Sequence, residues 1–284
     1  MLAGDAVVAA YRDACLAELA ALKPGNVHIF ADGHDMTTAD FASSAAASAP
    51  AMGAPALSVG ARVFEAIRCT REAVDCNTNL GIVLLCAPLA QAALSSGKGS
   101  LRDRVRWVLE KLDVADAEQA FAAIRLAEPG GLGTAPQHDV RAGATVSLAV
   151  AMAAAADRDR IAAQYANGFA DIFDLGLPRL RAGLERWGSE RWATTSAYLA
   201  FLARLPDSHV ARKHGIERAE AICAKARPYA ERLDETEDPD RLATPFLAFD
   251  QELKAAGINP GTSADFTVAT LFAHRIETAE RLVG

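Results

Sequence analysis

The first twenty residues, MLAGDAVVAAYRDACLAELA (1–20), indicate the kind of fold, because Tyr11, Cys15 and Leu19 recur every four positions, as on one face of an α-helix. Such periodicity continues along most of the 284 residues, and no stretch shows the alternation of a half-buried strand. Alanine is abundant and only 6% of residues are aromatic, which favours close-packed helices over sheets. We therefore predict an all-α fold, a bundle of about a dozen helices forming a single domain over residues 1–284.

Prolines, glycines and capping residues mark the predicted helix ends. A small-residue helix that begins near Thr37 is predicted to end at Pro50, and one capped by Asp207 is predicted to reach Arg232. The longest apolar run, residues 142–156, is too short to span a bilayer and is predicted as a buried helix. Further helices are predicted at residues 57–74, 81–94, 101–112, 116–127, 157–175, 179–187, 191–205, 242–256 and after the NPGTS stretch at 259–263.

The charge balance limits the partners that the chain can bind. It carries 29 basic and 36 acidic residues, a net charge of −7, and has no run of Lys and Arg. A nucleic-acid-binding protein normally presents a basic surface, so we expect no nucleic-acid partner. An anionic ligand would have to be held locally, by a few Lys and Arg side chains, by helix N-termini or through a bound cation.

The cysteines and the N-terminus favour a cytoplasmic location. Five cysteines without a CxxC pair argue against a disulfide framework and against a thiolate zinc site. The N-terminus carries charge throughout and has no basic segment ahead of its apolar residues, unlike a signal peptide. We therefore expect a protein without a membrane partner.

Polar motifs gather at the predicted helix junctions. The segment KPGNVHIFADGHDM (23–36) brings Lys23, His28, His34 and Asp35 onto one turn, although a helix stop followed by a solvated loop explains it as well. Its His-x5-His spacing fits no standard zinc pattern. In CNTNLG (76–81), the residues Asn77, Thr78 and Asn79 either cap the following helix or leave its N–H groups open to an anion.

Three further motifs lie in the second half of the chain. GGLGTAPQHDVRAG (130–143) lacks the P-loop pattern and a preceding strand, so we expect a ligand-contacting loop with Gly131, Gly133, Thr134 and His138. In DSHVARKHG (207–215), the cations Arg212 and Lys213 are predicted phosphate ligands. In NPGTSADF (259–266), Thr262 and Asp265 have capping-box spacing, and the carboxylate could also bind a metal or act as a base.

Together these motifs resemble the triphosphoribosyl-dephospho-CoA synthase family. The similarity rests on KPG, GHDM, Asn77-Thr78, the GxGT loop followed by His138, DSHVARKHG and NPGTSADF, in this order, and covers about residues 10–275. The chain has NTNLG where the family usually has NTHKG, and KPGNVH rather than KPGLVD, as in a divergent branch.

The resemblance implies an all-α transferase. Known members transfer the triphosphoribosyl group of ATP to the ribose 2′-hydroxyl of 3′-dephospho-CoA and release adenine, which gives the prosthetic-group precursor of citrate lyase and malonate decarboxylase. Two alternatives stay open. One is an ATP- or nucleotide-dependent transferase or ligase in the biosynthesis of another cofactor, such as a C1 carrier. The other is a non-catalytic nucleotide-binding protein.

The implied reaction assigns expected roles to the motif residues. Displacing adenine at C1′ builds positive charge on the ribose, and such chemistry commonly uses an acid and a base. We predict Glu65 and Asp207 as the acid–base pair, and Asp35 and Asp265 as ligands of the Mg²⁺ expected with ATP. The predicted substrate and phosphate ligands are Lys23, His28, His34, Asn77, Thr78, Asn79, Gly131, Gly133, Thr134, His138, Arg212, Lys213 and Thr262. The alanine-rich helices could pack within one protomer or across a homodimer.

Overall fold

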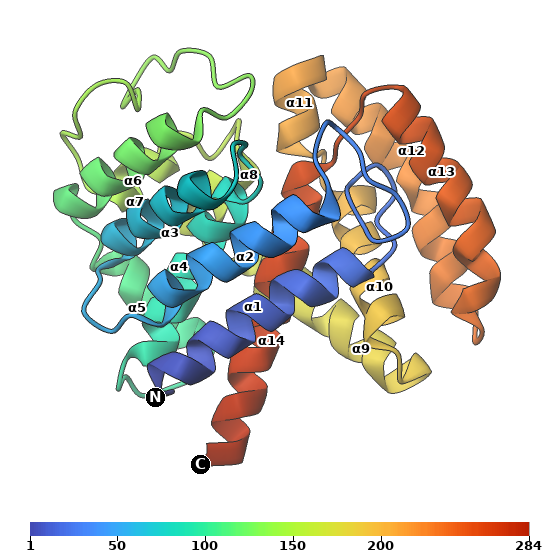
Figure 1. Cartoon of the computed structure of the whole chain (residues 1–284), viewed down its shortest axis with the longest axis horizontal. Helices are drawn as coiled ribbons and strands as arrows, with labels where there is room; N and C mark the ends of the chain where they lie inside the picture. Colours follow the sequence, from blue (N-terminus) through green and yellow to red (C-terminus); the bar gives the residue numbers. More distant parts are fainter. Residues whose placement is uncertain (284) are drawn as a thin grey trace.

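The computed structural model describes residues 1–283 and is built from helices joined by loops (Figure 1). It contains fourteen α-helices, one π-helical segment and one 3₁₀ turn. No β-strand occurs among residues 1–283, where isolated bridges join His28 to Ala31 and Gly33 to Met36. The prediction of an all-α, multi-helix bundle is therefore confirmed.

The N-terminal helices begin at the capping residues that the sequence contains. Thr37, Ser100 and Asp113 each cap a helix and pair with an aspartate three residues later, which completes a capping box. The helices of this part are α1 (Gly4–Ala20), α2 (Thr38–Gly53), α3 (Val59–Ala73), α4 (Leu80–Leu94), α5 (Leu101–Glu110) and α6 (Val114–Ala127).

Helix α2 continues past Pro50 to Gly53, so the predicted end at Pro50 was wrong. Proline removes one backbone donor, but Pro50 lies in the last turn of the helix, where little of the hydrogen-bond ladder remains. This last turn packs against the beginning of α1, and a Cβ atom on Gly53 would overlap the carbonyl oxygen of Gly4. The two glycines thus let α1 and α2 approach closely, and this packing keeps the last turn helical.

The apolar run at 142–156 does not form the long buried helix that we predicted. Only α7 (Leu148–Ala153) is helical there, Ser147 caps it, and Val150 is 49% exposed. Before α7, backbone donors bind the α6 region instead: the N–H of Ala144 donates to Glu118 at 2.7 Å and that of Leu148 to the carbonyl oxygen of Asp113 at 3.1 Å. The next predicted helix is also divided, at Gly168 and Phe169, which both have positive φ. The segments that follow α7 are α8 (Arg160–Asn167), the π-helical segment Asp171–Gly176 and α9 (Leu177–Trp187).

The predicted helix from Asp207 to Arg232 is two helices. Gly215, with φ of +88°, separates them, and the second one contains Pro228 without ending there. The C-terminal elements are α10 (Glu190–Arg204), α11 (Ser208–His214), α12 (Ile216–Glu235), the 3₁₀ turn Pro239–Leu242, α13 (Ala243–Ala255) and α14 (Gly261–Val283).

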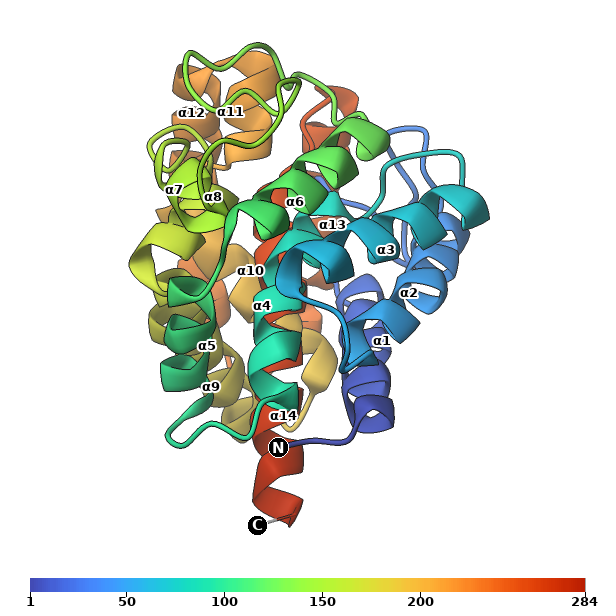
Figure 2. The same cartoon turned by 90° about the vertical axis from the view of Figure 1, so that its left-hand side faces the viewer.

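Helix α14 runs through the middle of the molecule (Figures 1 and 2). It packs against α1, α4 and α10, which join it to both sides of the bundle. One hydrophobic cluster lies mainly in α1–α8 and α14, and a second one joins α10, α12 and α13. None of the helices described within residues 1–283 combines the length and the apolar character needed to cross a membrane.

Candidate active site

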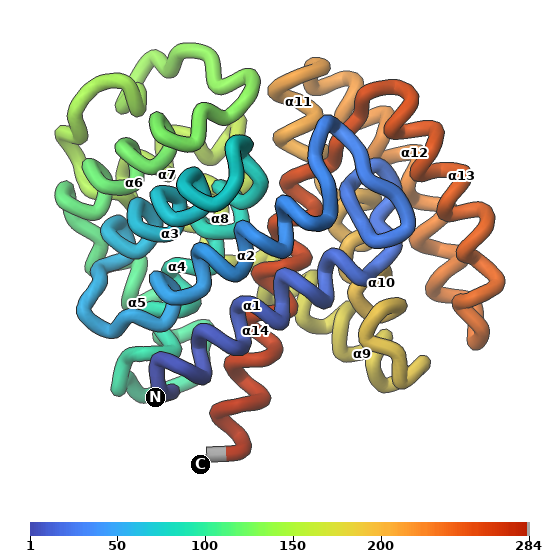
Figure 3. Tube along the Cα trace, viewed as in Figure 1, coloured from blue at the N-terminus to red at the C-terminus, as the bar shows by residue number. Residues whose placement is uncertain are grey.

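A cavity of about 950 Å³ lies where loop 21–37, loop 128–147 and α11 come together. These segments, far apart in the sequence, gather at one end of the molecule (Figure 3). The N-terminal ends of α4, α8, α11 and α14 also reach the cavity, through Gly81, Ile161, Ser208 and Thr262 among others. Helix N-termini carry partial positive charge, so their convergence favours an anionic ligand in an otherwise acidic chain. Asp159 and Asp207 already accept hydrogen bonds from the first N–H groups of α8 and α11.

Most of the predicted site residues line this cavity. They come from every motif singled out in the sequence, which confirms that the motifs fold onto one pocket. The predicted residues in the lining are His34, Asp35, Asn77, Thr78, Asn79, Gly131, Gly133, Thr134, His138, Arg212, Lys213, Thr262 and Asp265.

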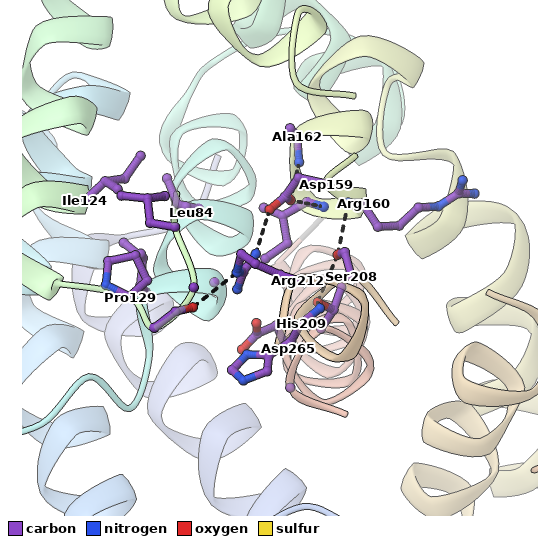
Figure 4. Close-up of a pocket in the computed structure, with 18 of the residues that line it drawn as sticks. Leu84, Ile124, Pro129, Asp159, Arg160, Ala162, Ser208, His209, Arg212 and Asp265 are labelled. Carbon is purple, nitrogen blue, oxygen red and sulfur yellow. Dashed lines mark hydrogen bonds and ion pairs between the residues drawn. The ribbon is translucent and has the colours of Figure 1, made fainter. Parts of the chain in front are cut away.

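Asp265 is the partly buried carboxylate at the centre of this arrangement (Figure 4). Its side chain has no hydrogen-bond partner within residues 1–283, and it does not close a capping box with Thr262, which lies inside α14. Burial raises the pKa of Asp265 well above its usual value, and the nearby carboxylates of Asp207 and Glu18 raise it further. The negative charge of these carboxylates favours a cation or a developing positive charge beside Asp265, whereas the nearby Arg212 acts in the opposite direction.

The position of Asp265 depends on a glycine in α4. A Cβ atom on Gly81 would overlap the Asp265 carboxylate and would lie 2.7 Å from Cδ1 of Ile161. The first turn of α4 therefore approaches the carboxylate directly, with no side chain between them.

Asp207 is occupied as a structural cap, so the predicted acid–base role is not supported. Its Oδ1 accepts hydrogen bonds from the N–H groups of His209 and Val210, at 2.9 and 3.1 Å. Its Oδ2 accepts from the N–H and the hydroxyl of Ser263, both at 2.8 Å. Burial raises the pKa of Asp207, while these donors oppose the shift. Asp207 thus joins α11 to α14 from outside the cavity lining.

Glu65 lies on the outer side of α3 and does not line the cavity. Its carboxylate accepts two hydrogen bonds from Arg68, at 2.9 and 2.6 Å, and this guanidinium lowers the pKa of Glu65. Arg68 also pairs with Glu72, one turn further along α3. A catalytic role for Glu65 is therefore not supported.

Lys23 and His28 are fully buried and lie outside the lining. The Lys23 ammonium donates to Glu18 and to Oδ1 of Asn26, the latter at 3.0 Å, and both of these acceptors line the cavity. Nε2 of His28 lies 3.3 Å from Oδ1 of Asp250 in α13. Burial lowers the pKa of both Lys23 and His28. The two side chains therefore support loop 21–37 and do not contact a ligand in the cavity.

The cationic side of the cavity joins α11 to the glycine-rich loop. Arg212 donates to Oδ2 of Asp159 at 3.1 Å, and its Nε lies 3.4 Å from the carbonyl oxygen of Gly130. Lys213 is exposed next to Gly130. Gly131 has φ of +76°, a conformation that places this part of the loop against the Arg212 side chain and that favours glycine.

Several lining residues were not predicted as site residues. Glu18 lies on the buried face of α1, together with Tyr11 and Cys15. A glutamate at a helical position that is otherwise apolar was a signal in the sequence for a functional buried carboxylate. The side chain of Asn26, in the motif at 23–36, donates a hydrogen bond of 2.8 Å to Oδ1 of Asn259, in the motif at 259–266, and both residues line the cavity. No local pattern in the sequence announces a pair separated by more than two hundred residues.

The carboxylates of the cavity would hold Mg²⁺ together with a phosphorylated ligand. Within residues 1–283, no group of three or more His, Cys, Asp or Glu side chains is arranged to hold a metal ion by itself. Mg²⁺ is commonly held by one or two carboxylates plus substrate phosphates, and Asp265 and the exposed Asp35 both line the cavity. This donor set fits such a bound ion.

The fold and the cavity define an all-α protein with a pocket in which helix N-termini and cationic side chains surround the partly buried carboxylate of Asp265. The chain belongs to the ATP:dephospho-CoA triphosphoribosyl transferase family, whose model matches residues 5–283. This match confirms the family resemblance carried by the ordered motifs.

Two relatives illustrate the extent of the similarity. A protein of Stutzerimonas stutzeri (strain A1501), described as a 2-(5''-triphosphoribosyl)-3'-dephosphocoenzyme-A synthase, is 30% identical over 116 residues. This match spans 41% of the chain and only 39% of the relative's length. The crystal structure of an Archaeoglobus fulgidus protein, described as a triphosphoribosyl-dephospho-CoA synthase, superposes with a TM-score of 0.62 and a sequence identity of 24%. The match covers 81% of this chain and 95% of the Archaeoglobus fulgidus chain. The second similarity shows a shared fold.

Proposed function

We propose that the protein transfers the triphosphoribosyl group of ATP to the 2′-hydroxyl of 3′-dephospho-CoA and releases adenine. Family membership supports this reaction, and one observation of the cavity carries it. Four helix N-termini and the cations Arg212 and Lys213 converge on the same cavity as Asp265, which has no hydrogen-bond partner in the described chain. The volume of about 950 Å³ is at the upper end of ordinary ligand pockets, as two nucleotide-sized substrates require.

The proposed reaction exchanges one bond at C1′ for another. The bond between C1′ and N9 of adenine breaks, with its electron pair going to the base, and a bond forms between C1′ and the acceptor oxygen. The acceptor hydroxyl loses a proton and adenine gains one, so protons balance. Positive charge builds on the ribose in between, and the Asp265 carboxylate, in its negative surroundings, would stabilise that charge.

The other lining residues would bind and orient the substrates. Arg212, Lys213 and the backbone of residues 130–134 would hold the triphosphate, and His34, Asn77, Thr78 and His138 would contact the nucleotides. A Mg²⁺ ion bound with ATP would neutralise phosphate charge, and Asp265 and Asp35 are its proposed protein ligands. Mg²⁺ binding, a homodimer, a cytoplasmic location and one domain over the whole chain stay predictions.

The proposed function is tested by incubating the purified protein with ATP, Mg²⁺ and dephospho-CoA and separating the products by chromatography. We expect adenine and a product heavier than dephospho-CoA by one triphosphoribosyl group. Adenine at background level would refute the proposal. Formation of ADP or AMP would instead favour another nucleotide-dependent reaction on this scaffold.

Asp265→Asn then tests the central residue. This variant keeps the side-chain shape and removes the charge, so we expect adenine release to fall by about 100-fold or more with little change in melting temperature. Glu65→Gln is the matched control, since it removes a carboxylate outside the cavity and should leave turnover unchanged. Near-normal turnover of Asp265→Asn would remove this carboxylate from the mechanism.

A further inference from the structure

The cavity has two chemically different sides. One side, called here the apolar wall, is formed by side chains of α4, α6 and α8 and of α7 with the turn after it. Its members are Leu84, Phe121, Ile124, Met152, Ala155 and Ile161. The other side carries amide, imidazole and carboxylate groups, among them Asn26, His209 and Asp265. Figure 4 shows Leu84 and Ile124 apart from His209 and Asp265, with the Arg212 side chain between the two groups.

The apolar wall is part of the rigid helical scaffold. Helix α6 packs on α7, α7 on α8, and α8 on α4. Leu84, Phe121 and Met152 belong to the buried residues of the protein and still contribute to the lining. No member of the wall has a side chain that forms strong hydrogen bonds. A ligand group that lies against it therefore has to be uncharged and to present an apolar face.

The apolar wall extends as far as the proposed reaction centre. A Cβ atom on Gly81 would lie 2.7 Å from Cδ1 of Ile161 and 2.6 Å from Cγ of Asp265, so both side chains adjoin the same point of α4. In the proposed reaction, C1′ of the donor reacts beside Asp265. The donor's adenine is bonded directly to that carbon. The acceptor's own adenine is separated from the reacting 2′-hydroxyl oxygen by two ribose carbons, and its pantetheine arm lies farther away, beyond a diphosphate. The group nearest to the reacting carbon is thus the adenine ring of the donor.

We propose that the apolar wall is the subsite for the adenine ring of the nucleotide donor, an assignment that rests on the proposed function. The flat face of the ring packs against the aliphatic and aromatic side chains of the wall. The triphosphate then lies along Arg212, Lys213 and the glycine-rich loop, which follows α6 in the chain. Because the wall holds the base without side-chain hydrogen bonds, adenine can leave once the bond to C1′ is broken.

Ala155→Leu tests this subsite. Ala155 is a partly exposed member of the wall, so a leucine there fills the subsite from its edge. Ala153→Leu is the matched control, because Ala153 is exposed on α7 and does not line the cavity. Both variants and the wild type are titrated by calorimetry, in the presence of Mg²⁺, with ATP, with inorganic triphosphate and with dephospho-CoA, each alone.

We expect Ala155→Leu to weaken ATP binding by about tenfold or more and to leave the binding of the other two ligands within about twofold. Inorganic triphosphate has no ring, and the adenine of dephospho-CoA is expected in a separate acceptor subsite. Unchanged triphosphate binding also shows that the variant is folded with its phosphate-binding end intact. Ala153→Leu should bind all three ligands as the wild type does.

Three results would overturn the subsite. They are wild-type ATP affinity in Ala155→Leu, weakened dephospho-CoA binding with unchanged ATP binding, and equal weakening of all three ligands. The second result would assign the apolar wall to the acceptor. Each of them leaves the proposed function intact as long as the wild type releases adenine. Conversely, a wild type that binds ATP and forms no adenine contradicts the proposed function while the binding comparison still tests the subsite.

Discussion

Gly81→Ala is predicted to inactivate the protein without unfolding it. The new Cβ atom would lie 2.6 Å from Cγ of Asp265 and 2.7 Å from Cδ1 of Ile161, closer than real Cβ contacts. Ile161 can yield at its flexible end, but the aspartate side chain is short and its whole carboxylate has to move by about 1 Å. A displacement of that size in a reacting group costs about 100-fold in rate.

The stability change should be small by comparison. Gly81 lies in the first turn of α4, where alanine is favoured over glycine by up to about 1 kcal/mol. Overpacking against the two side chains costs about 1–3 kcal/mol. The free energy of unfolding should therefore change by no more than about 3 kcal/mol, which leaves a folded protein at room temperature.

Adenine release and urea denaturation measure the two effects separately. Gly143→Ala is the control, since a Cβ atom there meets only Glu118, at an ordinary 3.7 Å, and lies outside the cavity lining. The double variant Gly81→Ala with Asp265→Asn should be no slower than Asp265→Asn alone, because both changes act on one carboxylate. Full activity of Gly81→Ala, or additive losses in the double variant, would refute the reasoning.

Three other predictions concern binding and stability. Arg212→Ala should weaken the binding of both ATP and inorganic triphosphate by about tenfold in calorimetry. Arg241→Ala, which removes an exposed ion pair with Asp238 outside the lining, should not, and equal affinities of the two variants would exclude Arg212 as a phosphate ligand. Asp207→Asn should lower the free energy of unfolding, measured by urea denaturation, by about 3 kcal/mol, because an amide cannot accept the four hydrogen bonds that the carboxylate accepts. A loss below about 1 kcal/mol would contradict the role of Asp207 as a cap. Burial and the neighbouring Arg212 lower the pKa of His209 from 6.5 to about 3. Below pH 6.5, His209 therefore takes up a proton in the unfolded chain but not in the folded one. The free energy of unfolding then falls by up to about 1.4 kcal/mol per pH unit. His209→Gln should flatten the dependence between pH 6.5 and 5.5, and an unchanged slope would show that this imidazole is not the cause.

The helical architecture could be predicted because its signals are local. Apolar spacing and capping residues such as Thr37 and Asp113 act over a single turn, and the structure follows them closely. The failures arise where distant packing decides. Helix α2 continues past Pro50 because Gly53, at its end, packs against Gly4 of α1. In the stretch 142–156, the N–H groups of Ala144 and Leu148 bind Glu118 and the carbonyl oxygen of Asp113, so contacts with the α6 region replace helical hydrogen bonds there.

The location of the site could also be predicted, but the role of each side chain could not. Motif order predicts that the segments meet, and the shared cavity confirms it. Whether a polar residue faces a ligand or holds the scaffold depends on partners far away in the sequence. Asp207 illustrates this, since its second oxygen is used by Ser263, and Lys23 is neutralised by Glu18.

This distinction has an energetic basis. A carboxylate buried against several donors, as Asp207 is, stabilises the fold through those hydrogen bonds, and its loss should lower stability and activity together. A carboxylate held against other carboxylates without a donor, as Asp265 is, costs folding free energy, so removing its charge should leave the fold intact or make it more stable. Functional sites commonly keep such unfavourable groups, because the ligand supplies the missing partner. Asp265→Asn and Asp207→Asn should therefore change stability in opposite directions, and a loss of stability of similar size in both variants would show that Asp265 is a scaffold residue as well.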